Sequence, residues 1–135
     1  PLCCAAGIAS IQVLQEEKII ENSRRMGEVL ASELEALKDK HACVGDVRSL
    51  GLMACMELVK NKKTREPLVP YGASGKATTL SKEISKRLKQ KGLFTIVRWL
   101  FLFVTPPLNI TERELRQGVA IIDEVLDFVD QQTDN

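Results

Sequence analysis

One apolar segment constrains the fold of this chain more than any other. Residues 92–108 read GLFTIVRWLFLFVTPPL, and Arg98 is the only ionisable side chain among them. The segment is rich in β-branched and aromatic residues, which favours two short strands or one bent strand. Pro106 and Pro107 end it, because proline cannot donate a hydrogen bond to a sheet. We therefore expect part of a sheet here.

Arg98 is also the first candidate for function. A guanidinium group keeps its charge at any ordinary pH, so a buried arginine needs an anionic partner. That partner is either an Asp or Glu of the same chain or the carboxylate of a ligand. A further interpretation places Arg98 at a strand end with its charged head in water. From the residues alone a structural role is the more common outcome, since perturbed charges are often structural.

Composition indicates one globular domain. The chain has 135 residues, enough to bury a core without a disulfide or metal. Its 19 basic and 18 acidic residues leave a net charge of +1, which gives no electrostatic argument for nucleic acid or an anionic membrane. No apolar segment is long enough to span a bilayer. The four cysteines lack zinc spacing, so we expect free, buried thiols in a cytoplasmic protein.

Two helical patterns open the chain. Residues 2–14 are apolar on every side, which is typical of a buried helix. Residues 16–40 carry an apolar stripe among charged residues. The two patterns form separate helices or one helix with a bend near residues 15–18. A strand is expected over residues 52–59, and residues 61–75 form either a functional loop or a solvated connection.

The second half of the chain ends in a well-marked helix. A helix is also expected over residues 76–91, before the apolar segment. Thr111 and Glu114 form a capping box, which marks the start of the last helix. The apolar stripe of that helix comprises Leu115, Val119, Ile122, Leu126 and Val129. The order predicts an α/β fold of two layers (α+β), in which helices cover one face of a small, mainly antiparallel sheet of three to four strands.

Catalytic motifs are missing from the sequence. It has no glycine-rich phosphate loop, no cluster of His, Cys and Asp with metal spacing and no G-x-S-x-G. The single histidine, His41, follows a Lys-Asp-Lys run at a helix end, and we expect it to be solvated. No lysine lies in an evident apolar pocket that would lower its pKa for covalent chemistry. We therefore assign no catalytic, cofactor-binding or metal-binding residue to this chain.

Several segments nevertheless resemble one enzyme family, in the same order along the chain. They are the Ala-rich run 1–10, GDVRSLGLM at 45–53 with Glu57 after it, KGLF at 91–94, and RW at 98–99 followed by PPLNIT at 106–111. The family is the class III pyridoxal-phosphate (PLP) aminotransferases. The Arg98-Trp99 pair is similar to the branch that moves amino groups between ω-amino acids or taurine-like compounds and pyruvate.

The resemblance covers the whole chain and implies the C-terminal small domain of a fold-type-I enzyme. Residues 1–40 would be connecting helices and residues 41–135 an α/β sandwich. An upstream large domain of the same chain would bind PLP through a lysine, and the enzyme would be a homodimer. It would transfer an amino group from an amino acid or amine donor to a keto acid such as pyruvate. The present chain alone would be inactive and bind no PLP.

The resemblance assigns substrate binding to Arg98 and Trp99. Arg98 matches the small-domain arginine that binds a substrate carboxylate, and its planar guanidinium can hold a carboxylate with two parallel hydrogen bonds. Trp99 is a core residue or a wall of that site. Arg48 is expected to fix the turn before Gly51. Residues 100–102 depart from the family pattern, because close relatives tend to be polar there, and they imply a more apolar pocket.

Two other functions remain open for the sequence. One is a non-catalytic α/β interaction module that keeps the fold and binds a partner through the apolar segment. The other is a decarboxylase or aminomutase of the same family, because the reaction type is set largely by the large domain.

Overall fold

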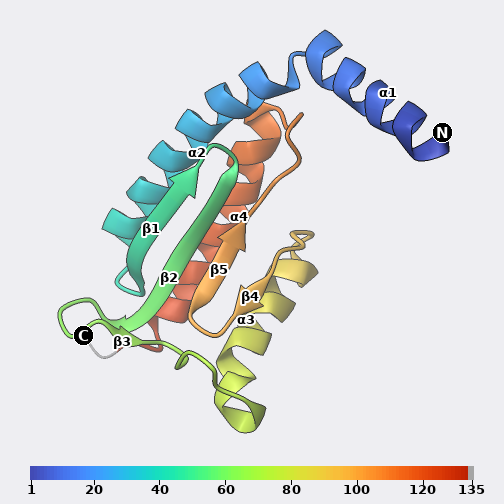
Figure 1. Cartoon of the computed structure of the whole chain (residues 1–135). Coiled ribbons are helices and arrows are strands. Elements are labelled where there is room, and N and C mark those ends of the chain that lie inside the picture. Colours follow the sequence, from blue (N-terminus) through green and yellow to red (C-terminus); the bar gives the residue numbers. More distant parts are fainter. Residues whose placement is uncertain (134–135) are drawn as a thin grey trace.

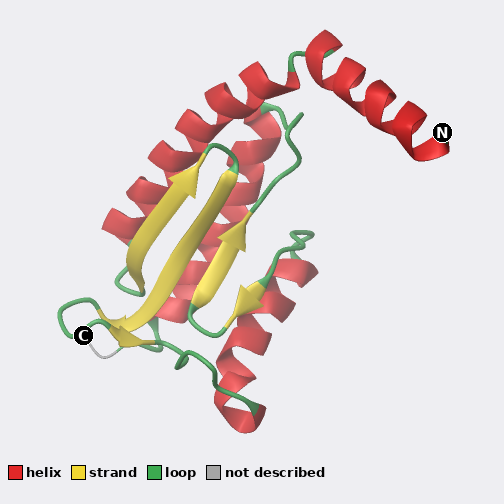
Figure 2. Cartoon of the chain, viewed as in Figure 1, coloured by secondary structure: helices red, strands yellow, loops and turns green. Residues whose placement is uncertain are grey.

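A small antiparallel sheet and the helices behind it make two layers in the computed structural model, which describes residues 1–133 (Figure 1). Helices α2, α3 and α4 lie on one side of the sheet, and no helix covers the side that faces the viewer in Figures 1 and 2. The elements are α1 (Leu2–Glu16), α2 (Ile19–Lys40), β1 (Val44–Leu50), β2 (Met53–Asn61), β3 (Glu66–Pro67), a 3₁₀ turn (Gly75–Thr78), α3 (Thr79–Gln90), β4 (Val97–Arg98), β5 (Phe101–Val104) and α4 (Glu112–Asp130). The predicted two-layer α/β class is confirmed.

The sheet has the strand order β1-β2-β5-β4, with β3 paired to the end of β2. All neighbouring strands are antiparallel. The expected strand at 52–59 is β2, whereas β1 was not expected and forms a hairpin with it. Gly51 supplies the turn of this hairpin at φ 56°, a conformation that glycine adopts without a steric penalty. The apolar segment 92–108 gives two short strands, β4 and β5, rather than one bent strand.

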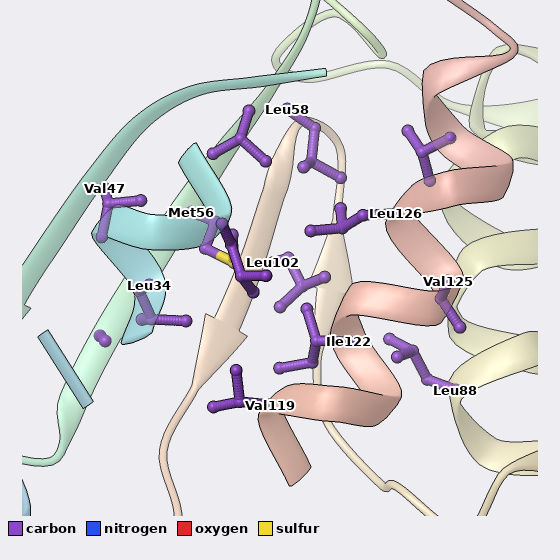
Figure 3. Packing of buried hydrophobic residues seen from close by; sticks show 14 of the residues in the cluster. Leu34, Val47, Met56, Leu58, Leu88, Leu102, Val119, Ile122, Val125 and Leu126 are labelled. Carbon is purple, nitrogen blue, oxygen red and sulfur yellow. The ribbon is translucent and has the colours of Figure 1, made fainter. Parts of the chain in front are cut away.

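Alternate residues of the strands point into the layer between sheet and helices. In β2 the buried residues Ala54, Met56 and Leu58 share one face, and Leu102 of β5 lies opposite Met56 in the register. Figure 3 shows Met56 and Leu102 pointing toward Ile122 of α4. Burying each large side chain of this kind stabilises the fold by about 1.5–3 kcal/mol. The stripe predicted for the last helix is buried in full: Leu115, Val119, Ile122, Leu126 and Val129.

Helix α2 packs closely against the β1–β2 turn. A Cβ atom placed on Gly27 would lie 2.5 Å from the Cα of Gly51, so the helix backbone and the turn backbone touch. The helical conformation is interrupted between α1 and α2 at Lys18, whose backbone is left-handed with φ 52°. The first two helices are therefore separate.

Helix α1 is exposed along its length, and the expectation of a buried helix is wrong for the described residues. None of its residues is buried, and Leu2, Ile8 and Ile11 are 84%, 59% and 57% exposed. The physical reason is that α1 leans away from the sheet and contacts α2 alone among the described elements (Figure 1). The apolar side chains of α1 are therefore not covered by other described residues.

Two of the four cysteines are exposed because they lie on α1. All four are free, as expected, but Cys3 and Cys4 are exposed on α1 and Cys55 is half-buried. Only Cys43 is fully buried, and burial raises the pKa of its thiol far above the usual value. No helix of the described residues is both long and apolar enough to cross a membrane.

Candidate substrate-binding site

Arg98 lies on the face of the sheet that no helix covers. It pairs with Phe101 in the register between β4 and β5, and Phe101 pairs with Glu57 of β2. Residues directly opposite one another share a face, so these three side chains point away from the helices. The neighbouring pair, Val97 and Leu102, points the other way, and Leu102 has no exposed surface.

The guanidinium group of Arg98 is available to a ligand. Its Cζ lies 4.4 Å from the centre of the Trp99 ring, a cation–π contact worth about 0.5–1 kcal/mol at an exposed site. Among the described residues Arg98 makes no hydrogen bond or ion pair, and its side chain is exposed. An internal Asp or Glu partner is therefore not found. The structure places Arg98 at a strand end, as the third interpretation described.

Trp99 is half-buried and does not belong to the hydrophobic core. Its indole Nε1 donates a hydrogen bond to the carbonyl oxygen of Ala73 at 3.0 Å. Its own carbonyl oxygen accepts one from the Ser81 hydroxyl, also at 3.0 Å. The ring of Tyr71 packs against it with centroids 4.5 Å apart. The sequence did not single out Tyr71, Ala73 or Ser81, because no motif marks residues of α3 or of the loop before it that contact a distant turn.

Aromatic rings continue from Trp99 along the uncovered face. The centroids of Tyr71 and Phe101 lie 6.4 Å apart, and those of Phe101 and Phe103 lie 6.2 Å apart. The result is a cation at the end of an apolar strip. Such a surface can hold an anionic head group on Arg98 and an apolar chain on the rings.

Arg48 lies on the same face as Arg98 but is already paired. Its guanidinium contacts the Glu57 carboxylate across β1 and β2, and its Nε lies 3.8 Å from Asp46. Arg48 therefore has a structural role in the hairpin that Gly51 closes, although its contact joins the two strands rather than the turn itself. Of the two arginines, Arg98 is the one without a carboxylate.

The site holds no group for covalent catalysis among the described residues. Every described lysine is at least partly exposed, whereas covalent chemistry typically uses a lysine in an apolar pocket. A separate hollow of about 210 Å³ lies between residues 93–95, the end of β5 and α4, and Arg98 does not line it. Its one carboxylate, Glu114, is engaged in the predicted capping box with Thr111. The hollow is otherwise mostly apolar.

His41 is buried, and the prediction of a solvated histidine is wrong. Its side chain is 1% exposed; Nδ1 lies 2.7 Å from Asp130 and Nε2 2.6 Å from Asp123. Each ring nitrogen thus lies within hydrogen-bond distance of an aspartate carboxylate. The sequence could not predict this pairing, because the two aspartates lie 82 and 89 residues further along the chain.

The same cluster resembles a metal site only in its residue types. Ligand atoms of His41, Asp127 and Asp130 lie within 4.8 Å of one another. However, Asp130 also accepts a hydrogen bond from the Cys43 amide at 2.8 Å, and the Lys40 ammonium lies 2.6 Å from Asp123. The cluster is a salt bridge between the end of α2 and α4.

The chain matches the model of the family "Aminotransferase class-III" over residues 1–126. It belongs to this family.

Relatives and solved structures agree with the match. The 5-aminovalerate aminotransferase DavT of Pseudomonas aeruginosa is 33% identical, over 94% of this chain and 28% of the relative. A taurine–pyruvate aminotransferase of Bilophila wadsworthia has the same identity and coverage. The solved taurine:2-oxoglutarate aminotransferase of Bifidobacterium kashiwanohense, in complex with PLP and glutamate, superposes with a TM-score of 0.90 at 33% identity, over 98% of this chain and 29% of that one. The chain thus spans less than a third of their length.

Proposed function

We propose that this chain is the C-terminal small domain of a PLP-dependent aminotransferase and that Arg98 binds the substrate carboxylate there. The observation that carries the proposal is the state of Arg98, which is exposed, lacks a carboxylate partner among the described residues and lies over the Trp99 ring. An unpaired arginine in a fixed place is suited to bidentate binding of a carboxylate. Family membership supports the same assignment.

The proposed reaction transfers an amino group from an amino acid or amine donor to a keto acid such as pyruvate. Relatives named for 5-aminovalerate and for taurine with pyruvate support donors that carry an anionic group away from the amine. PLP, when bound, supplies the electron-withdrawing ring on which the amino group is exchanged. Without a buried lysine among its described residues, this chain does not fit PLP, so the remainder of the protein would hold it.

The residues of this chain would bind and orient the substrate. Arg98 would hold the carboxylate, and Trp99 would form the wall beside it. The ring of Phe101, which neighbours Arg98 in the sheet, would exclude water from the substrate chain. Exclusion of water strengthens the ionic contact to Arg98, because the local dielectric falls.

The large PLP-binding domain of the same protein is the proposed partner of the uncovered face. The face carries exposed apolar side chains, and α1 is exposed and apolar, so both need a covering surface. We include in the proposal that the whole enzyme is a cytoplasmic homodimer with residues 1–40 connecting its two domains. Free cysteines support a reducing compartment.

The full-length protein, supplied with PLP, tests the proposed reaction. The donors are 5-aminovalerate, 4-aminobutyrate and taurine, and the acceptors are pyruvate and 2-oxoglutarate. We expect alanine or glutamate to form from at least one donor. Release of CO₂ or an isomerised amino acid without amino transfer would instead indicate a decarboxylase or an aminomutase. Failure to bind PLP would indicate a non-catalytic interaction module.

A further inference from the structure

The geometry points to Ser81 and Tyr71 as positioning residues that hold Trp99, and through it Arg98, in the place that receives the substrate carboxylate. The inference rests on the proposed function of Arg98. It adds a second part of the chain to the site, because Ser81 lies in α3 and Tyr71 in the loop before it. Neither residue belongs to a motif that was recognised in the sequence.

Trp99 needs outside support because of its backbone. Its φ is 56°, in the left-handed region, where a bulky residue without glycine's freedom is a clear outlier. Such a conformation persists only when neighbouring groups determine it, and these positions cluster at ligand sites. The conformation makes the tight turn from β4 to β5 and places the indole ring beside the guanidinium of the preceding residue.

Ser81 fixes the backbone of that turn. Its side chain is 3% exposed, and Ser81 and His41 are the two buried polar residues within 1–133. The Ser81 hydroxyl donates to the carbonyl oxygen of Trp99 at 3.0 Å. A buried hydroxyl with one protein partner holds that partner strongly, since loss of the contact leaves both groups unsatisfied.

The loop before α3 fixes the ring of Trp99. The indole Nε1 donates to the Ala73 carbonyl oxygen at 3.0 Å, and the Tyr71 ring packs 4.5 Å away at an interplanar angle of 56°. Ala73 is itself held by a turn, in which its amide donates to the Pro70 carbonyl oxygen at 3.1 Å. The ring is therefore restrained at its polar edge by Ala73 and packed against Tyr71.

A restrained Trp99 ring pre-orients Arg98. The Arg98 side chain has several rotatable bonds, and fixing them on binding opposes affinity. Stacking of the guanidinium at 4.4 Å from the ring restricts that freedom before the substrate arrives. Loss of Ser81 or Tyr71 should therefore weaken carboxylate binding without removing the charge.

The test uses the full-length enzyme loaded with PLP and compares Ser81→Ala and Tyr71→Ala with wild type. The donors are the best carboxylate donor, such as 5-aminovalerate, and the matching amine in which methyl replaces the carboxylate, n-pentylamine. We expect each variant to raise KM for the carboxylate donor about three- to tenfold, the equivalent of one side chain's lost pre-organisation. The kcat for that donor and the KM for the amine stay within about twofold.

Two further variants separate positioning from general damage. Tyr71→Phe keeps the ring and restores the wild-type KM. Ser85→Ala removes a hydroxyl one turn further along α3 and serves as the matched control, since the hydrogen bond to the Trp99 carbonyl comes from Ser81. Thermal unfolding is followed for all variants, and Tyr71, which is 74% exposed, keeps the test valid should Ser81→Ala fail to fold.

The outcomes distinguish this inference from the proposed function. Arg98→Ala is measured alongside. A large loss for Arg98→Ala with unchanged KM values for Tyr71→Ala and Ser81→Ala would overturn the positioning roles alone. Equal losses for the acid and the amine in the positioning variants would also overturn them. No loss for Arg98→Ala would overturn the proposed function, and the positioning roles with it.

Discussion

At the residue scale, two arginines on one sheet face differ in what they contact. Arg48 contacts Glu57 and lies near Asp46, whereas the Arg98 guanidinium lies over the Trp99 ring and has no carboxylate partner within the described part of the chain. A paired arginine is largely neutralised, so a ligand anion gains little from it. The unpaired Arg98 is the residue on which function depends in our proposal.

The candidate site was only partly accessible from sequence. A single charge in an apolar segment drew attention to Arg98, but the structure places its side chain in an exposed position, so the expected cost of a buried charge does not apply. The supports of Trp99 could not be predicted, because they depend on where the loop before α3 lies relative to a hairpin 18 to 26 residues later. Periodicity describes an element's own face and says nothing of such a contact.

Gly27 gives a prediction at the residue scale. Gly27→Ala should destabilise the protein by about 1–3 kcal/mol, because its Cβ would meet the backbone of Gly51 at 2.5 Å. Gly118→Ala in α4 is the control, since its Cβ would meet only a Leu93 side-chain atom at 3.7 Å. That change should be neutral or stabilising by up to about 1 kcal/mol. Urea unfolding measures both, and equal effects would contradict the close approach.

At the element scale, charged side chains join the end of α2 to α4. Burial alone would raise the pKa of Asp123 and of Asp130, but hydrogen bonds outweigh it. His41 binds both carboxyls, Lys40 also binds Asp123, and the Cys43 amide also binds Asp130. Both pKa values therefore lie below the usual value for an aspartate.

His41→Ala should lower the free energy of unfolding at pH 6 by about 1.5–3 kcal/mol, the range for hydrogen bonds to charged groups, because it removes a hydrogen-bond partner from two partly exposed carboxylates. A carboxyl with a lowered pKa stabilises the fold above its unfolded pKa of about 3.9, and the stabilisation is lost as pH falls through the folded value. The difference between wild type and variant should therefore shrink below about pH 4. Urea unfolding from pH 6 to pH 2 checks this, with exposed Asp39→Asn as control. A constant difference would contradict it.

The capping box of α4 is a second prediction at this scale. The Thr111 hydroxyl accepts from the Glu114 amide, and the Glu114 carboxylate accepts from the Thr111 amide at 3.0 Å. Thr111→Ala removes the cap and should lower the free energy of unfolding by about 0.5–2 kcal/mol. Thr111→Ser keeps the hydroxyl and should cost less than half as much. Equal losses for Ala and Ser in thermal unfolding would show that the cap contributes nothing.

Helices and strands whose own residues show a clear polarity pattern or cap were predicted well. The last helix followed from its stripe and its cap, and β2 followed from its apolar residues. Strand β1 was missed because Arg48, Ser49 and Leu50 are exposed in it, so its residues do not alternate in polarity along the strand. Its partner β2 and Gly51, rather than its own residues, make it a strand.

At the scale of the whole molecule, the apolar surfaces of this chain remain uncovered. Within residues 1–133, helix α1 has no buried residue and no helix covers the sheet face with Arg98. The sequence predicted a buried α1 because its residues are apolar. Among the described residues, however, nothing buries that helix. The chain covers 28% of the length of the two relatives named above.

Residues 1–135 alone should bind no PLP, because no described lysine is buried to hold it. The purified chain, incubated with PLP and desalted, should show no cofactor absorbance band. The full-length protein treated in the same way should keep one. A band retained by residues 1–135 would contradict this division of roles.

The most direct test of our account measures Arg98→Ala in the full-length enzyme with two donors of equal chain length. For a carboxylate donor such as 5-aminovalerate, kcat/KM should fall by about 30- to 4,000-fold, the equivalent of 2–5 kcal/mol for truncating one partner of a charge pair. For n-pentylamine, in which methyl replaces the carboxylate, kcat/KM should change by less than about threefold. An unchanged value for the carboxylate donor, or an equal loss for both donors, would contradict the role of Arg98.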